Sequence, residues 1–198
     1  MTQQPHQPSN LAARRAYWQA LGQFLDMFAT VEATLFFALS HYAKTPPNTA
    51  RAIFSGVRVD TATSFLRRIM EVENISLDLA ADLKSALDQL HIINKVRNDL
   101  VHYGALSVSD NADVMIVTNA LLALTKDRLH TTPVSVQILD DLVADLHKIQ
   151  AHLVTRHVGW GPNESGFVDV VMPERGRLLS ISWRYKSPPQ SHGRSRTP

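Results

Sequence analysis

The sequence predicts an all-α protein: a bundle of about four or five helices with a small β-hairpin before the last helix. Over long stretches, apolar residues recur at spacings of three and four, which keeps one face of a helix inward. Prolines fall between these stretches, where they end a helix. One short segment instead alternates apolar and polar residues, as an antiparallel strand does. With 44% hydrophobic and 19% charged residues, the composition is that of a globular protein.

The first helix is expected over residues 11–43, as one helix or two in line. "TPPN" (Thr45 to Asn48) ends it, because proline cannot continue a helix. Its apolar stripe consists of Tyr17, Leu21, Phe24, Phe28, Val31, Leu35 and Leu39.

A short helix near residues 49–54 and a longer one over 60–72 follow. Ser76 has the side chain of an N-cap and begins a long helix that runs to about Tyr103. Gly104 suits the position just past the end of this helix.

After this helix, the spacing of the apolar residues changes. The segment "GALSVSDNADVMIVTN" alternates around "SDNAD" and predicts a hairpin with a polar turn. Ser135, after Pro133, begins the last helix. On that helix Asp140, Asp141 and Asp145 are expected on the solvated face. Its apolar stripe consists of Leu139, Leu142, Leu146, Ile149 and Leu153.

Three regions are expected along the chain: a flexible leader (1–10), one helical domain (11–158) and a basic tail (159–198). In the tail, glycine, proline and arginine become frequent and helical periodicity fades, so its order is left open. From Pro173 onward it holds six basic residues against Glu174 alone. Such a tail can hold a polyanion through phosphate contacts or simply be a solvated terminus.

Several classes of protein are excluded. With no cysteine, the chain has no disulfide, thiolate zinc site or cysteine nucleophile. The sequence shows no HExxH spacing, no glycine-rich phosphate loop and no G-x-S-x-G elbow, so we expect neither metal nor cofactor. The polar amino terminus lacks signal-peptide regions, and no apolar run approaching ~20 residues is evident. A cytoplasmic protein with no membrane contact is expected.

Two charged residues lie in stripes that should be apolar. Arg97 follows Leu90 by seven residues and Ile93 by four, within the stripe Leu79, Leu83, Leu90, Ile93, Leu100 and Val101. Glu32 lies in the apolar face of the first helix. Because an unpaired buried charge is very costly, we expect Glu32 and Arg97 to form a partly buried ion pair or to line one cleft. A structural ion pair without chemistry is the alternative.

The segment "RNDLVHYG" places His102 five residues after Arg97, about 140° around a regular helix. Asn98 shares the side of His102. Arg97 and His102 would therefore converge only if the helix loosened towards Gly104, or if a second copy of the chain supplied part of the site.

Arginine and histidine together suit one metal-free reaction. Histidine transfers protons near neutral pH, and the planar guanidinium of arginine matches two phosphate oxygens. The 2′-hydroxyl of RNA can attack the adjacent phosphate, giving a 2′,3′-cyclic phosphate, whereas DNA lacks this hydroxyl. The expected roles are proton transfer for His102 and phosphate binding for Arg97. Asn98 would orient the substrate or His102, and Glu32 would position Arg97.

"VRNDLVHYG" resembles the signature of HEPN domains, in which an arginine, usually followed by a polar residue, precedes a histidine with four to six residues between the two. Arg97, Asn98 and His102 match this pattern. The resemblance spans about residues 11–157, but its specific part is the eight residues "RNDLVHYG". It implies a bundle of four or five helices with the motif at the end of a late helix.

The resemblance also implies a homodimer that brings two motifs into one cleft. Many members are endoribonucleases in toxin–antitoxin, phage-defence or RNA-processing systems, which makes RNA and an antitoxin or other regulator the implied partners. One toxin subgroup has a tyrosine two residues after the histidine, where this chain has Ala105. Tyr103 instead follows His102 directly, where it can stack on a base or pack at the helix end.

The leading hypothesis is thus a dimeric, metal-independent endoribonuclease. The alternatives are a catalytically inactive HEPN-like binding or dimerisation module and a regulator that binds nucleic acid through its basic tail.

Overall fold

The computed structural model describes residues 8–103, 105–107, 114–118 and 131–158. The leader before residue 8, Gly104, the predicted hairpin turn and the tail lie outside the described residues. The elements are α1 (Pro8–Tyr42), α2 (Pro47–Phe54), α3 (Val59–Val72), α4 (Leu77–Tyr103), β1 (Ala105–Ser107), β2 (Val114–Thr118), β3 (Thr131–Ser135), α6 (Val136–His152) and the π-helical η1 (Leu153–Val158). The predicted helical bundle with a hairpin before its last helix is confirmed.

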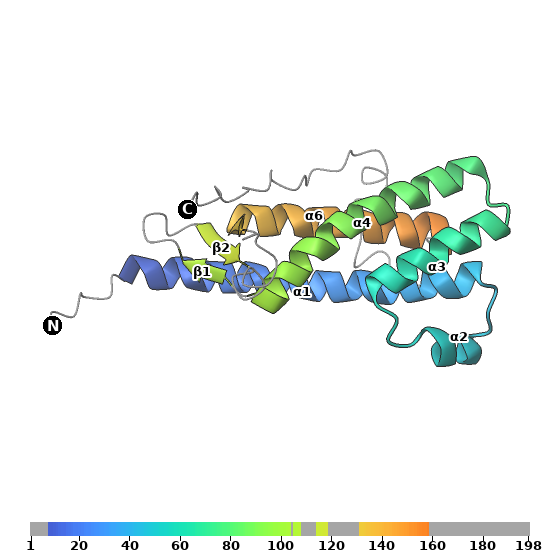
Figure 1. The fold of residues 1–198 in the computed structure, drawn as a ribbon, viewed down its shortest axis with the longest axis horizontal. Helices are drawn as coiled ribbons and strands as arrows, with labels where there is room; N and C mark the ends of the chain where they lie inside the picture. Colours follow the sequence, from blue (N-terminus) through green and yellow to red (C-terminus); the bar gives the residue numbers. More distant parts are fainter. Residues whose placement is uncertain (1–7, 104, 108–113, 119–130, 159–198) are drawn as a thin grey trace, which may run out of the picture.

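Helix α1 runs the length of the bundle, with α6 packed along it and α4 crossing the pair obliquely (Figure 1). Helix α3 packs on α1 and α4, while the short helix α2 lies beside this layer (Figure 1). The core forms where the apolar stripes meet, because each helix buries one face. Its largest fully buried side chains include Phe24, Phe28, Leu35, Leu83, Leu90, Ile93, Leu139, Leu142 and Leu146.

Two predictions about the helices need correction. Helix α1 begins at Pro8, three residues before the predicted start, and proline is tolerated in a first turn, where its missing N–H would have no helical partner. On α4, Val101 is not inward but 48% exposed. Val101 follows Arg97 by four residues, and on this last turn the apolar face that remains buried belongs to Leu100.

Helix α1 also corrects the expectation about apolar runs. From Leu11 to Tyr42 it is long and apolar enough, by length and composition, to cross a membrane. The core helix of a soluble protein passes the same test, and the stripe of α1 around Phe24, Phe28 and Val31 is buried against the other helices.

The sheet is larger than the predicted hairpin. Strands β1 and β2 pair antiparallel, with Leu106 opposite Ile116, as expected. Strand β3 was not predicted; it pairs with the other side of β2 and forms an edge of the sheet. Pro133 lies within β3, and an edge strand tolerates a proline because one side of its backbone has no partner strand. Ser135 then caps α6 by accepting a hydrogen bond from the Ile138 N–H at 3.2 Å.

Candidate functional site

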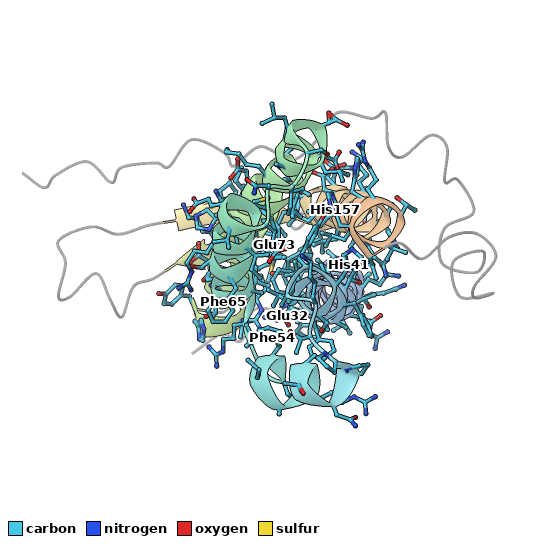
Figure 2. All side chains as sticks on the ribbon, turned by 90° about the vertical axis from the view of Figure 1, so that its right-hand side faces the viewer. Glu32, His41, Phe54, Phe65, Glu73 and His157 are labelled. Atoms are coloured by element: carbon cyan, nitrogen blue, oxygen red, sulfur yellow. The ribbon has the colours of Figure 1, made fainter. Side chains whose placement is uncertain are left out.

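A pocket of about 720 Å³ lies between the carboxyl-terminal third of α1, helix α2 with its connection to α3, and the last turns of α4. It is open on one side and has both polar and apolar walls. Four of the predicted site residues line it: Glu32, Arg97, Asn98 and His102. In Figure 2, Glu32 and Phe54, which line this pocket together, lie between α1 and α2. The pocket thus gathers residues that are far apart in the sequence.

Arg97 enters the pocket from the buried side of α4. Its guanidinium lies over the ring of Phe28, with 5.5 Å to the ring centroid, and donates a hydrogen bond to the Asn98 Oδ1 at 3.1 Å. Its Nε is buried without a hydrogen-bond acceptor among the described residues. A guanidinium has five N–H donors, so this arrangement holds the side chain in place and leaves donors for an anion.

His102 is exposed on the last turn of α4 and lines the same pocket. Helix α4 stays α-helical through Tyr103, so loosening of the helix does not bring the two motif residues together. Instead both side chains line one wide pocket. Among the described residues, no hydrogen bond or ion pair joins Arg97 to His102. A phosphate or a second copy of the chain would have to bridge the two side chains.

Glu32 and Arg97 line one cleft, which was one of the two expectations. The other, an ion pair, is wrong: in the described part of the chain no ion pair joins them. The reason is that Arg97 is already held by Phe28, one turn before Glu32 on α1, and by Asn98 on its own helix. Glu32 therefore faces the pocket from α1 without contacting Arg97 directly.

Tyr103 is absent from the pocket lining. It is half-buried, packs against the core and stacks edge-on with His102 at 6.5 Å between ring centroids. This placement favours the packing role over base stacking.

The second wall of the pocket could not be predicted from the sequence. Arg51 on α2, Arg58 just before α3 and Asp60 in the first turn of α3 line it as well. Asp60 accepts a hydrogen bond from the Asn94 Nδ2 at 2.9 Å, which ties α3 to α4. Arg51 and Arg58 belong to a short amphipathic helix and its connection, where a charged side chain breaks no apolar pattern.

A second polar cluster lies on the side of the bundle away from Glu32 and α2 (Figure 2). The Asp82 carboxylate on α4 lies 2.9 Å from the His157 Nε2 and 3.2 Å from the His152 Nδ1. The Tyr42 hydroxyl lies 2.7 Å from the His157 Nδ1. Burial, the largest effect, lowers the pKa of His157 although Asp82 opposes this, and burial raises the pKa of Tyr42.

His152 and His157 are five residues apart, a spacing that places two side chains on different faces of a regular α-helix. Here η1 is π-helical, and a π-helix bonds residues five apart and so aligns them. Asp145, expected on the solvated face, is also buried, where it pairs with Lys148 at 2.9 Å and accepts from Gln89 at 2.8 Å. Among the residues that the structure describes, no cluster of three or more histidines and carboxylates can hold a metal ion.

Comparison with family models, curated proteins and solved structures finds no match to this chain. The resemblance to HEPN domains therefore rests on the motif and on the order of the helices.

Proposed function

We propose that the protein is a metal-independent endoribonuclease of the HEPN type. The observation that supports this best is the pocket in which Arg97, Asn98, His102 and Glu32 come together. Arg97 is the strongest single element, because its guanidinium is held on two sides in a concave, partly polar site, and its Nη2 has no hydrogen-bond acceptor among the described residues. Such an arrangement suits the phosphate of an RNA backbone.

In the proposed reaction the 2′-oxygen of one nucleotide attacks the adjacent phosphorus, and the bond from phosphorus to the 5′-oxygen of the next nucleotide breaks. The proton of the 2′-hydroxyl goes to a base, and the departing 5′-oxygen receives a proton. His102 transfers one of these protons as acid or base. Arg97 stabilises the additional negative charge on the phosphate oxygens in the transition state. Asn98 holds the guanidinium, and the Glu32 carboxylate is placed to accept a hydrogen bond from a substrate hydroxyl.

The active form is proposed to be a homodimer in which the ends of two α4 helices meet. His102 and its neighbour Val101, which is 48% exposed, would lie at this contact. A dimer would bring two His102 side chains to one cleft and so supply both the acid and the base. Action on cellular RNA would place the protein in the cytoplasm, and an antitoxin or other regulator would control it.

The test is cleavage of a mixed RNA pool in excess EDTA. Wild type is compared with His102→Ala and Arg97→Ala, each checked for folding by circular dichroism. His41→Ala and Arg68→Ala are matched controls, because both residues are exposed and outside the pocket lining. We expect wild type and both controls to leave 2′,3′-cyclic phosphate ends. We expect each pocket variant to lose at least about a hundredfold in rate, the usual contribution of a proton-transfer or charge-stabilising group.

Cleavage that is equal in all variants would mean that another site or a contaminant is responsible. A folded wild-type dimer that cuts no RNA would favour the inactive binding module. In that case, deletion of residues 173–198 with a measurement of salt-dependent RNA binding would test the tail-based regulator.

A further inference from the structure

The pocket extends well beyond the motif, to two arginines with no assigned role. Arg51 on α2 and Arg58 just before α3 both line it, and both are exposed. Within the described residues neither forms an ion pair or a side-chain hydrogen bond. Their guanidinium groups are thus available to a ligand that occupies the same pocket as Arg97.

The position of Arg58 is fixed by the contact between α3 and α4. Asn94, one turn before Asn98 on α4, donates to Asp60, and Asp60 follows Arg58 by two residues. The backbone at Arg58 is therefore held beside the turn of α4 that carries Arg97.

The position of Arg51 is fixed by helix α2. Phe54, on the same helix, is buried and packs against Phe65 of α3 with 6.3 Å between ring centroids. Gly56 turns the chain between the two helices with a positive φ of 76°, which other residues rarely adopt. In Figure 1 the connection that carries Arg58 lies between α2 and the carboxyl end of α4. Arg97, Arg58 and Arg51 thus line the same pocket from α4, from the connection before α3 and from α2.

An aromatic wall accompanies these cations. Phe36 and Phe37 on α1 line the pocket and contact each other edge-to-face at 5.5 Å between centroids. Phe37 is 40% exposed. Proteins bind single-stranded nucleic acid with basic side chains placed along its phosphate backbone and with aromatic side chains on which bases stack. This pocket has both kinds of side chain.

We infer that Arg58, Arg51 and Phe37 form a binding track for single-stranded RNA that continues from the phosphate held by Arg97. The two arginines contact phosphates neighbouring the scissile one, and Phe37 stacks against an unpaired base. The substrate is accordingly an unpaired stretch of several nucleotides. This inference rests on the proposed function, since the track leads to the proposed cleavage centre.

The experiment compares two substrates with the same scissile step: a dinucleotide, which reaches only Arg97 and His102, and a longer unstructured oligonucleotide. Wild type is compared with Arg58→Ala, Arg51→Ala and the control Arg15→Ala, an exposed arginine of α1 outside the pocket lining. For the longer substrate we expect Arg58→Ala and Arg51→Ala each to lower kcat/KM by about tenfold, the effect of losing one charge-assisted contact. For the dinucleotide we expect less than about a twofold change from either variant, since no contact is lost.

A second measurement does not depend on cleavage. Binding of a 2′-O-methyl oligonucleotide, whose blocked hydroxyl cannot attack, is titrated against salt. Each lost phosphate contact should reduce the slope of log affinity against log salt by about 0.7 for a single strand. Arg15→Ala should leave the slope unchanged.

The two measurements separate the track from the nuclease. Equal losses on both substrates, or slopes equal to that of Arg15→Ala, would overturn the track even if RNA is cut. A reduced slope in a protein that cuts neither substrate would support the track and overturn the nuclease.

Discussion

At the scale of single residues, Arg97 shows how a charge can lie within an apolar stripe. Placing a guanidinium there is costly unless its N–H groups and its flat faces find partners. Phe28 covers one face, and Asn98, the next residue, accepts one hydrogen bond. Neither partner is charged, so the positive charge of Arg97 is held in position without being neutralised. An ion pair with a carboxylate would have neutralised this positive charge, which an anion-binding site needs.

The relation between Glu32 and Arg97 can be measured by a double-mutant cycle with Glu32→Gln and Arg97→Gln. Since no ion pair joins the two in the described part of the chain, we expect their effects on the free energy of unfolding to add within about 0.5 kcal/mol. The single and double variants are unfolded in urea under identical conditions. Lys148 and Asp145 do form a buried ion pair. In the matched cycle, the effects of Lys148→Gln and Asp145→Asn should therefore be clearly non-additive. Strong coupling between Glu32 and Arg97 would restore the ion pair as their relation.

His157 predicts a pH dependence of stability. Burial lowers the pKa of His157 below its ordinary value of 6.5, so the folded protein favours the neutral imidazole. The unfolded chain starts to bind a proton at this histidine as the pH falls through 6.5, before the folded protein does. We therefore expect stability to be retained above pH 6.5 and to fall below it, by at most about 1.4 kcal/mol per pH unit for this one group.

The measurement is the free energy of unfolding in urea between pH 7.5 and 5.5, for wild type and His157→Gln. The variant cannot bind the proton, and its stability should depend less on pH across this window. An unchanged pH dependence in the variant would assign the effect to other groups.

At the scale of elements, local geometry decides which side chains meet. The change from α6 to η1 brings His152 and His157 to the same carboxylate, although they are five residues apart. On a regular α-helix these two side chains would diverge by about 140°. Arg97 and His102 have the same spacing on the regular helix α4, and only the wide pocket includes both. Equal spacings thus have different consequences on the two helices.

The start of α6 offers a test of a single helix cap. Ser135 ends β3 and accepts a hydrogen bond from the Ile138 N–H. We expect Ser135→Ala to lower the free energy of unfolding by about 1 kcal/mol, because a helix N–H loses its acceptor. Ser135→Asp, which keeps an acceptor, should retain most of the stability. If both variants lose the same amount in thermal or urea unfolding, the pairing of β3 rather than the cap would explain the loss.

At the scale of the whole molecule, α1 and α6 form the support on which α3 and α4 position the pocket. A buried polar network joins two of these elements: Asp145 and Lys148 on α6, and Gln89 on α4. The side chain of Asp145 is fully buried and that of Lys148 is 4% exposed. This network fixes how α4 lies on α6, and α4 carries the motif.

Removal of one side chain of this network should therefore lower the stability of the fold strongly. We expect Asp145→Ala to lower the free energy of unfolding by about 3–5 kcal/mol, because the buried Lys148 would lose its ion pair with the Asp145 carboxylate. Asp140→Ala, at an exposed position of the same helix, should change stability by less than about 0.5 kcal/mol. Urea unfolding of both variants checks this, and comparable small effects would mean that Lys148 reaches solvent when its partner is lost.

The helices, most of their inward stripes and their order along the chain could be predicted from the sequence. Periodicity reports burial directly: Leu139, Leu142 and Leu146 recur at helical spacing and are all fully buried. It also identified Arg97 and Glu32, because a charge within an apolar stripe breaks the pattern.

The residues that those charges contact depend on the packing of the helices and could not be predicted. Arg97 is held by Phe28 and Asn98 instead of Glu32, and Arg51 and Arg58 join the pocket from α2 and its connection. Strand β3 and the burial of Asp145 likewise depend on contacts between elements distant in the chain. The physical reason is that helical spacing fixes which face of one element is inward, whereas the partner across the interface depends on how the elements pack.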